Sequence, residues 1–295
     1  MKVLVTGSEG QLARSLAERA AAFTQLDIRL VGRPELDLER PETIAPALDA
    51  AAPDVIINAA AYTAVDQAED EPERAMKVNA EAAGALATAM RRRGGRFVQI
   101  STDYVFDGRA GQPYREESPV GPLGVYGRTK LAGEEAVRHA HPEAAIIRTA
   151  WVYSPFGRNF VATMMRLAEE RDEVAVVADQ KGSPTSALDL ATGVLTMVDE
   201  WADGGKTGLG GTYHLAGSGA ATWHQVAAQV FEELQSLGRK APALRPIGTG
   251  EWPTRAARPA NSVLDSASFV RAFGYTMPDW RSSVRETVRR LAGSP

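Results

Sequence analysis

The sequence predicts an α/β protein built on a doubly wound parallel sheet, with a smaller α/β lobe toward the C-terminus. Three observations predict this fold class. Short β-branched runs alternate with helical segments up to about residue 150, the first run ends in a glycine-rich loop, and turns become frequent after residue 150. Such alternation with short connections is typical of βαβ units whose parallel strands are covered by helices on both faces.

The first domain is expected to contain five strands and the helices between them. Each expected strand is a short apolar run, at 2–6, 28–31, 54–60, 96–102 and 144–150. Helices are expected at 10–22, after Pro41, at about 73–93 and at 127–140. The third of these ends in "RRRGG", where arginines favour a helix C-terminus and glycine stops the helix.

The second half of the chain is less regular. Only "TYHLAG" at 212–217 has the pattern of the earlier strands. We predict a larger domain over 1–150, to which segments near 174–180 and 212–236 return, and a smaller lobe formed mainly by 151–295. Ligands of doubly wound sheets bind at the carboxyl ends of the strands, so polar residues at those ends are the first candidates for a site.

The composition excludes several classes of function. The chain has 295 residues, 44% of them hydrophobic and 24% charged, as in soluble globular proteins. A net charge of −4 argues against a nucleic-acid partner, and the absence of cysteine excludes disulfides, thiolate metal sites and cysteine nucleophiles. No apolar run approaches the ~20 residues of a bilayer span, and the N-terminus lacks a signal-peptide pattern. We therefore expect a cytoplasmic protein with no membrane or nucleic-acid partner.

The glycine loop indicates a dinucleotide. The sequence "GSEGQLA" at 7–13 follows the first strand and opens the first helix, with the spacing G-x-x-G-x-x-A. Gly7 permits a tight turn, Gly10 lets a pyrophosphate approach the helix N-terminus, and the small Ala13 allows close helix–strand packing. An ordinary glycine-rich turn is the alternative, but the position at the first strand–helix junction predicts a Rossmann-type site.

The end of the second strand predicts which dinucleotide binds. An acidic residue there favours NAD, whereas an arginine favours the 2′-phosphate of NADP. Here no acid ends the strand and Arg33 follows at once. The sequence therefore favours NADPH, with NADH still possible, and Asp37 and Leu38 are expected beside the adenine.

Tyr126 and Lys130 are four residues apart and share one face of the helix expected at 127–140. A tyrosine titrates near ~10 in model peptides, and a neighbouring ammonium group lowers that pKa. Thr102 and Asp103 lie where the strand at 96–102 ends. Taken alone, a tyrosine followed four residues later by a lysine is common, and on an arbitrary helix such a pair is more often a surface pair than part of an active site. Combined with the glycine loop and Thr102, it predicts a carbonyl reductase in which Tyr126 gives a proton and Thr102 orients the carbonyl.

Together these residues resemble the extended short-chain dehydrogenase/reductases, and within them the family of dTDP-4-dehydrorhamnose reductases. The most specific matching stretches are "PDVIINAAAYTAVDQAE" (53–69) and "STDYVFDG" (101–108). Others occur in the family's order along nearly the whole chain: "GSEGQLA" (7–13), "YGRTKLAGE" (126–134), "RTAWVY" (148–153), "DQKGSPT" (179–185), "TYHLAG" (212–217), "ATWH" (221–224) and "ARPANSVLD" (257–265).

The resemblance implies reduction of the 4-keto group of dTDP-4-dehydro-6-deoxy-L-mannose to dTDP-L-rhamnose, with NADPH or NADH. It implies that Tyr126 is the proton donor, Lys130 its partner and Thr102 the carbonyl-orienting hydroxyl. Tyr126 and Lys130 are also expected to contact the cofactor, with Lys130 at the nicotinamide ribose. The remaining implied contacts are Gly10, Gln11, Leu12, Ala61, Tyr62 and Thr63 with the cofactor, and Thr102, Asp103 and Trp151 with the substrate. Asn79 falls where a residue often supports such sites, although a helix-surface amide is the alternative.

A dTDP-sugar carries a pyrophosphate, which requires arginine or lysine. The second lobe offers Arg239, Lys240, Arg245, Arg255 and Arg258, and Arg258 within "ARPANS" is the preferred candidate. Trp151 follows a strand end, where stacking on the substrate competes with a core role.

The chain departs from the family at two sites, of which the loss of the third glycine, at Ala13, is minor. Some members form dimers bridged by Mg²⁺ through two glutamates, and the corresponding positions here are Ser15 and Leu188. We expect no metal at that site, and a monomer or a weak homodimer.

Other functions remain open at this point. A related enzyme would reduce a different dTDP-4-keto-6-deoxyhexose, because sugar stereochemistry is read by loops that the sequence does not place. A regulatory protein would keep the fold but lose the Thr–Tyr–Lys set, and all three residues are present. An epimerase or dehydratase would share the Tyr–Lys pair, and Asp103 leaves that alternative open.

Overall fold

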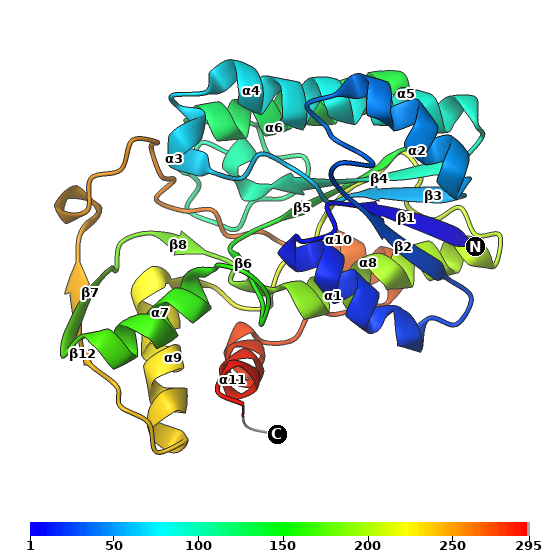
Figure 1. Cartoon of the computed structure of the whole chain (residues 1–295). Helices are drawn as coiled ribbons and strands as arrows, with labels where there is room; N and C mark the ends of the chain where they lie inside the picture. Colours follow the sequence, from blue (N-terminus) through cyan, green and yellow to red (C-terminus); the bar gives the residue numbers. More distant parts are fainter. Residues whose placement is uncertain (294–295) are drawn as a thin grey trace.

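The computed structural model describes residues 1–293 and has a central parallel sheet of six strands in the order β10-β5-β4-β3-β1-β2 (Figure 1). Its strands are β1 (Lys2–Thr6), β2 (Asp27–Val31), β3 (Val55–Asn58), β4 (Arg96–Thr102), β5 (Ala145–Thr149) and β10 (Thr212–His214). All neighbouring pairs are parallel. The predicted doubly wound α/β fold is confirmed: the central strands β3 and β5 are buried along their whole length, as parallel strands covered on both faces require, and the edge strands β2 and β10 are partly exposed.

Helices cover both faces of the sheet (Figure 1). Two buried apolar clusters lie between helices and sheet, one toward α1 and α8 and the other toward α2, α5 and α6. The helices on these faces are α1 (Gln11–Arg19), α2 (Ile44–Ala51), α5 (Ala82–Arg92), α6 (Val125–Ala140) and α8 (Ala187–Ala202). The helix expected at 73–93 consists of α4 (Pro72–Met76), a π-helical turn (Lys77–Glu81) and α5 in succession.

The smaller lobe has its own core. Its parallel strands β7 (Glu173–Val177) and β12 (Ala243–Ile247) pack with α7 (Phe160–Glu170), α9 (Trp223–Ser236) and α11 (Trp280–Leu291) around a third apolar cluster. Short pairs and helices complete the fold: β6 (Val152–Tyr153) with β9 (Thr185–Ser186), β8 (Lys181–Gly182) with β11 (Ala221–Thr222), α3 (Val65–Ala68) and α10 (Ala267–Phe273). Four 3₁₀ turns are η1 (Ala20–Ala22), η2 (Pro41–Thr43), η4 (Asp103–Val105) and η5 (Thr249–Glu251).

The segments that belong to each lobe differ in part from those expected from the sequence. The segment 212–214 does join the main sheet, beside β5. In contrast, the segment near 174–180 forms β7, which pairs with β12 in the smaller lobe, and α9 packs there too. The long apolar helix α8 instead packs on α1 and the main sheet. We propose a larger domain that includes 187–217 in addition to 1–150, because apolar faces rather than sequence order decide which lobe a helix joins.

The carboxyl ends of β1, β3, β4 and β5 meet at one edge of the sheet, next to the smaller lobe (Figure 1). Buried side chains fix their register there: Thr6 donates to Asn58 at 2.7 Å, and the Asn58 amide donates to Gln99 at 2.9 Å. Within residues 1–293, none of the helices combines the length and the apolar character needed to cross a lipid bilayer.

Candidate active site

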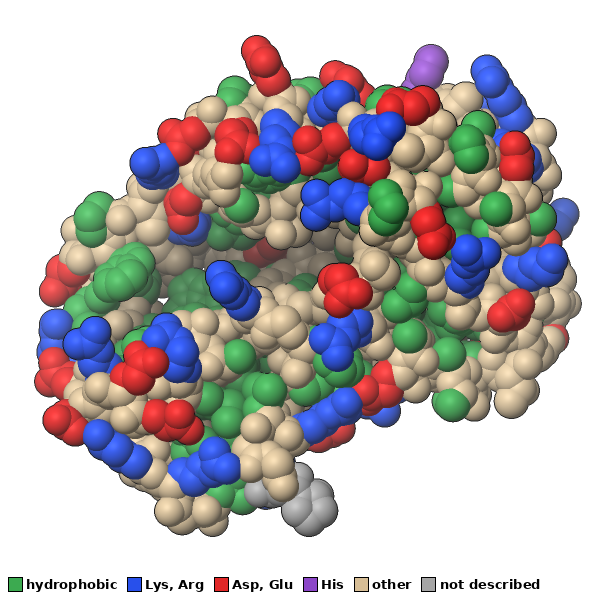
Figure 2. Space-filling view, viewed as in Figure 1, with side chains coloured by type: hydrophobic (Ala, Val, Ile, Leu, Met, Phe, Trp, Pro, Cys, Tyr) green, Lys and Arg blue, Asp and Glu red, His purple; other side chains and the backbone are tan. Residues whose placement is uncertain are grey.

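A cavity of about 1050 Å³ lies at this edge of the sheet. The space-filling view shows the surface hollowed between the two lobes, with basic side chains at its rim (Figure 2). Both lobes contribute walls, since residues of the glycine loop, of the strand ends and of the segment after β5 all line it. A cavity of this size, at the switch point of a doubly wound sheet, is large enough for a dinucleotide and a second ligand.

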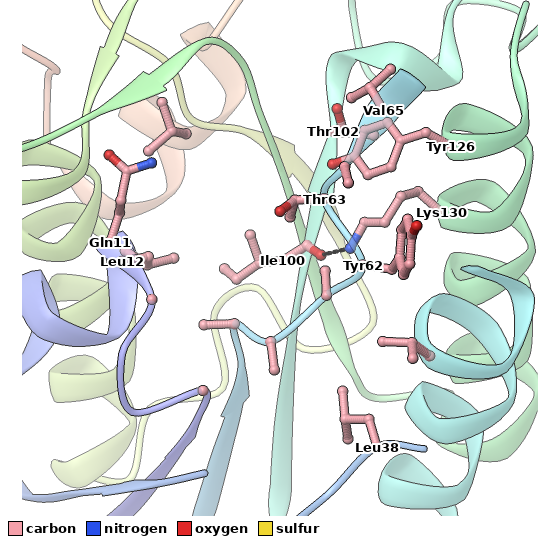
Figure 3. Close-up of a pocket in the computed structure, with 18 of the residues that line it drawn as sticks. Gln11, Leu12, Leu38, Tyr62, Thr63, Val65, Ile100, Thr102, Tyr126 and Lys130 are labelled. Atoms are coloured by element: carbon pink, nitrogen blue, oxygen red, sulfur yellow. Dashed lines mark hydrogen bonds between the residues drawn. The ribbon is translucent and has the colours of Figure 1, made fainter. Parts of the chain in front are cut away.

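Nearly all the site residues expected from the sequence line this cavity. They are Gly7, Gly10, Gln11, Leu12, Arg33, Asp37, Leu38, Ala61, Tyr62, Thr63, Thr102, Asp103, Tyr126, Lys130 and Trp151. Arg258 is not among the lining residues. Figure 3 shows the labelled members converging from the first helix, the segments after β2 and β3, the end of β4 and helix α6.

The glycine loop presents an open helix N-terminus. Gly7 has φ +89°, a left-handed conformation that side chains resist, and Gly10 precedes α1 in an extended conformation. No side chain caps α1, and its first turn contains no acidic residue. Its first backbone N–H groups are therefore free to donate to an anion, and the helix dipole favours negative charge there. These features fit the pyrophosphate of a dinucleotide.

The end of β2 approaches this loop closely. A Cβ at Gly32 would lie 2.5 Å from the hydroxyl oxygen of Ser8 and 3.2 Å from its backbone nitrogen, so a side chain there would displace Ser8 in the glycine loop. Arg33 is exposed at the cavity and makes no ion pair within residues 1–293. Leu38 is buried, and Asp37 accepts from the backbone N–H of Glu39 at 3.0 Å. An unpaired guanidinium beside an open helix N-terminus fits a phosphate on the adenosine ribose.

The backbone after β3 is held by Asn79. Tyr62 N–H donates to the Asn79 side chain at 2.8 Å, and the Asn79 amide donates to the Tyr62 carbonyl and to the Thr129 hydroxyl, both at 3.1 Å. Asn79 is buried within the π-helical turn, so the helix-surface alternative is wrong. It ties the cofactor-side loop to α6, which fits the tendency of π-turns to occur at functional sites.

Tyr126 and Lys130 extend from α6 along the same side of the cavity, with Thr102 beside the Tyr126 ring (Figure 3). Lys130 is buried, and its ammonium group donates to the Ile100 carbonyl at 2.7 Å. Burial lowers the pKa of Lys130 to about 8, against the opposing charge of Glu134. The edge of the Tyr104 ring packs on the Tyr126 ring at 5.6 Å between centroids.

One electrostatic expectation is wrong for the protein without ligands. The sequence argument had the ammonium group of Lys130 lowering the pKa of Tyr126. Instead, burial raises the pKa of Tyr126 to about 12, and a hydrogen bond with Thr102 opposes the shift only in part. Desolvation penalises the phenolate more than the neighbouring groups favour it. Tyr126 therefore holds its proton firmly at neutral pH.

Thr102 and Asp103 form the end of β4. The Thr102 hydroxyl donates to one carboxylate oxygen of Asp103 at 3.0 Å, and the Tyr104 N–H donates to Thr102 at 3.2 Å. Asp103 is 2% exposed, and its other oxygen has no hydrogen-bond partner within residues 1–293. Burial raises the pKa of Asp103 from 3.8 to about 6. Asp103 lines the cavity, but this oxygen is itself shielded from solvent, and the Ser262 hydroxyl is the side-chain group that lowers the pKa most against the effect of burial.

We expect Asp103→Asn to stabilise the free protein at pH 8. A carboxyl whose pKa is raised by folding contributes stability below its unfolded value, and that contribution is lost as the pH rises through about 6. Two pKa units correspond to at most about 3 kcal/mol. Thermal unfolding at several pH values should give the variant a higher Tm at pH 8 and a shrinking difference below pH 6. An equal difference at pH 8 and pH 5 would contradict the assigned cause.

Two tryptophans form one wall of the cavity. Trp151 stacks on Trp223 with centroids 3.6 Å apart and planes 5° from parallel, and both line the cavity. Trp151 has φ 47°, a strained conformation for a non-glycine residue, as often occurs where a ligand binds. The sequence argument gave Trp223 no role in the site. The sequence signal for Trp223 was the match of "ATWH" to a family motif. The local sequence pattern does not show that this motif lies at the cavity.

The basic residues expected to hold a pyrophosphate are all engaged elsewhere in the free protein. Arg258 pairs with Asp66 at 2.7 Å, and Arg255 pairs with Asp70. Lys240, Arg239 and Arg245 pair with acids of the smaller lobe. Arg158 was not singled out from the sequence, yet it is exposed, lines the cavity and makes no ion pair within residues 1–293.

The two positions at which the resemblance implied metal-bridging glutamates hold no acidic residue in this chain. Ser15 and Leu188 are both buried between α1 and α8, and the Ser15 hydroxyl donates to the Gln11 carbonyl at 2.8 Å. Across residues 1–293, no group of three or more histidine or acidic residues is arranged to hold a metal ion.

Comparisons with known proteins agree on one family. The family model described as "RmlD substrate binding domain" matches residues 1–292. The chain is 45% identical to the dTDP-4-dehydrorhamnose reductase of Sinorhizobium fredii, over 99% of this chain and 98% of that protein. A crystal structure of dTDP-4-dehydrorhamnose reductase from Bacillus anthracis in complex with NADP is similar with a TM-score of 0.88 and 36% identity, over 98% of this chain and 99% of that one.

A further relative has a different described substrate. It is the probable dTDP-4,6-dihydroxy-2-methyloxan-3-one 4-ketoreductase of Streptomyces antibioticus, 40% identical over 97% of this chain and 94% of that protein.

Proposed function

Because this chain belongs to the family of dTDP-4-dehydrorhamnose reductases, which are NAD(P)H-dependent oxidoreductases, we propose that it reduces dTDP-4-dehydro-6-deoxy-L-mannose to dTDP-L-rhamnose. The single observation that carries the proposal is the convergence of Thr102, Tyr126 and Lys130 at a cavity whose other wall is an open helix N-terminus. The reaction would be the last step in the synthesis of dTDP-L-rhamnose.

The cofactor proposed is NADPH. Its support is the NADP complex of the Bacillus anthracis relative together with the exposed Arg33 at the end of β2. When bound, it supplies a hydride to the carbonyl carbon of the sugar. We propose that Gly7, Gly10, Gln11 and Leu12 hold the pyrophosphate, that Arg33, Asp37 and Leu38 hold the adenosine, and that Ala61, Tyr62 and Thr63 cover the side facing β3.

Tyr126 is proposed as the proton donor to the carbonyl oxygen. Reduction turns that oxygen into an alkoxide, which is far more basic than a phenolate. A phenol whose pKa is raised to about 12 is fully protonated at neutral pH and is therefore loaded for this transfer. Thr102, whose hydroxyl lies beside the Tyr126 ring, is proposed to orient the carbonyl by a second hydrogen bond (Figure 3).

Lys130 is proposed to balance the phenolate that forms as Tyr126 loses its proton. In the free protein its ammonium group already has a fixed donor contact, to Ile100, which keeps the side chain extended toward the cavity. A cation fixed before the reaction needs no reorganisation during it. On the substrate side, Asp103, Trp151 and Arg258 are proposed contacts, and Arg258 must leave Asp66 or share its charge to reach a pyrophosphate.

We expect Arg33→Ala to weaken NADPH while leaving NADH nearly unchanged. Loss of one charge-assisted contact to the 2′-phosphate corresponds to about 2 kcal/mol, or roughly 30-fold in KM for NADPH. Steady-state kinetics with both cofactors measure the change. Arg29→Ala is the matched control, because Arg29 lies on β2 four residues before Arg33, pairs with Glu35 at 3.3 Å and does not line the cavity. Equal losses with both cofactors would assign Arg33 another role.

Absorbance of the reduced nicotinamide tests the reaction itself. Purified protein is mixed with NADPH and dTDP-4-dehydro-6-deoxy-L-mannose, which is generated in place from dTDP-glucose by a dehydratase and an epimerase. Oxidation that depends on the epimerase and gives dTDP-L-rhamnose is the expected result. Oxidation only when the epimerase is omitted would assign a D-configured substrate.

A second candidate substrate is another dTDP-4-keto-6-deoxyhexose. The relative from Streptomyces antibioticus supports it, because the family at 40% identity includes a described reductase of a different keto sugar. Turnover of such a sugar at a kcat/KM above that of the L-mannose derivative would favour this candidate.

We further propose that the protein is a monomer or a weak homodimer. The absence of both bridging glutamates, at Ser15 and Leu188, supports this proposal. A stable dimer dissociated by a chelator in analytical ultracentrifugation would contradict it.

A further inference from the structure

A short acidic turn, residues 65–70, lies between the two lobes and contacts both. It comprises α3 and the following Glu69 and Asp70. We propose that this turn positions the active site: Glu69 fixes the N-terminus of α6, and with it Tyr126, while Asp66 fixes the loop 252–260 of the smaller lobe. The proposal rests on the proposed function, since it assigns positioning residues for that reaction.

Helix α6 has no cap of its own. Its N-cap residue is Gly124, which has no side chain, and its first turn contains no acidic residue. The carboxylate of Glu69, 56 residues earlier in the chain, accepts from Val125 N–H at 2.7 Å. A charge-assisted hydrogen bond at this point satisfies one of the free N–H groups and interacts favourably with the helix dipole. Glu69 therefore provides the hydrogen-bond acceptor that an N-cap side chain normally provides and that Gly124 lacks.

Gly124 makes room for this carboxylate. A Cβ at position 124 would lie 2.7 Å from the Glu69 carboxylate oxygen, closer than real contacts allow. Gly124 has φ −121°, which any residue adopts, so its backbone conformation does not require glycine. The same Cβ would lie 3.8 Å from Ala256, so the loop of the smaller lobe reaches this junction as well.

Asp66 holds that loop on the other side of the turn. One carboxylate oxygen accepts from Ala256 N–H at 3.0 Å and the other from Arg258 at 2.7 Å. Asp70, two residues beyond α3, pairs with Arg255. These contacts join residues about 190 positions apart, and Ala256 is buried by them. One turn of chain thus fixes the catalytic helix and the substrate lobe relative to each other.

The catalytic phenol is the nearest functional group to this junction. Tyr126 directly follows Val125, and both pack against Ala68 of the acidic turn. A displacement of about 1 Å at a reacting group can cost roughly 100-fold in rate. A loosened helix N-terminus therefore reduces kcat more than it reduces the affinity for NADPH, whose proposed contacts lie mainly in the segments after β1, β2 and β3.

Three variants test the role of Glu69. We expect Glu69→Ala to lower kcat by about 10- to 100-fold, with KM for NADPH changed by less than about 2-fold. In Glu69→Gln the amide oxygen still accepts from Val125, so kcat should stay within about 3-fold of the parent. Gly124→Ala, which displaces the carboxylate without altering it, should lower kcat as Glu69→Ala does.

The matched control is Asp279→Ala. Asp279 caps α11 by accepting from Arg281 N–H at 2.9 Å, far from the cavity lining. This variant should lower the Tm to a similar extent but leave kcat unchanged. Asp66→Ala, in turn, should raise KM for the dTDP-sugar by about 10-fold, because the loop that bears Arg258 loses both contacts.

Hydrogen–deuterium exchange separates this proposal from the identity of the substrate. Peptides covering 123–130 should exchange faster in Glu69→Ala and Gly124→Ala than in the parent, and no faster in Asp279→Ala, whatever sugar is reduced. Unchanged exchange in that peptide would overturn the proposal, as would a Glu69→Gln variant as slow as Glu69→Ala. If the parent turns over no dTDP-sugar but the exchange pattern holds, the proposed function fails and the positioning of α6 stands.

Discussion

Replacing Tyr126 by phenylalanine is expected to lower kcat by about 1000-fold while NADPH binding stays nearly unchanged, because the change removes a single proton-donating oxygen. The ring keeps its packing against Tyr104 and the apolar cluster formed by Ala68, Ala75 and Val125. Tyr62 and Tyr104 also line the cavity, and burial raises the pKa of Tyr104 further than that of Tyr126. Single-turnover oxidation of NADPH measures kcat, and fluorescence titration measures binding.

The matched control is Tyr104→Phe. Tyr104 is a cavity-lining tyrosine on the adjacent 3₁₀ turn and has the same aromatic contact, but it lacks a lysine four residues on. We expect it to change kcat far less than Tyr126→Phe does. Near-normal turnover of Tyr126→Phe, or equal losses in both variants, would remove Tyr126 from its proposed role.

The second large effect is expected at a buried ion pair behind the active site. Glu134 is fully buried and receives two hydrogen bonds from Arg148, at 2.9 and 2.7 Å, and one from Ser101 at 2.6 Å. Removing one partner leaves a buried charge without compensation, which costs about 3–5 kcal/mol. Glu134→Gln should therefore lower the free energy of unfolding, measured in urea, by this amount.

The same substitution also affects Lys130, one turn earlier on α6. The charge of Glu134 raises the pKa of Lys130 against the effect of burial, so its loss should move that pKa below about 8. As a control, Glu170→Gln breaks an exposed pair with Arg166 and should cost less than about 1 kcal/mol. If Glu134→Gln lowered the free energy of unfolding by less than about 1 kcal/mol, as expected for the exposed pair, water would have to reach the buried pair and compensate the remaining charge. Replacing both partners with apolar residues should recover part of the loss.

Much of the site follows from how parallel sheets are built. Every predicted strand of the main sheet forms, and the strands are parallel, so their carboxyl ends meet at one edge. For that reason Gly7, Thr102 and Tyr126, far apart in the chain, were expected together and line one cavity. Their roles in cofactor binding and proton transfer remain predictions that the experiments above address.

Other features depend on contacts that no local pattern encodes. The segment near 174–180 was expected to return to the larger domain, but the packing of apolar faces places it beside β12 in the smaller lobe. The direction of the pKa shift at Tyr126 also differs from the sequence argument. Sequence spacing shows a nearby ammonium group, whereas the depth of burial, which dominates, is a property of the whole fold.

The sequence by itself determined the order of strands and helices up to about residue 150, the glycine loop and the Tyr–Lys spacing, because each depends on neighbours within one or two turns of chain. Only the tertiary structure decided that Glu69 caps α6, that Asp66 holds Arg258 and that Trp223 stacks on Trp151. Each of these pairs joins residues dozens to almost two hundred positions apart. Their contact is fixed by how two lobes pack, and packing minimises the free energy of the whole chain rather than of any segment.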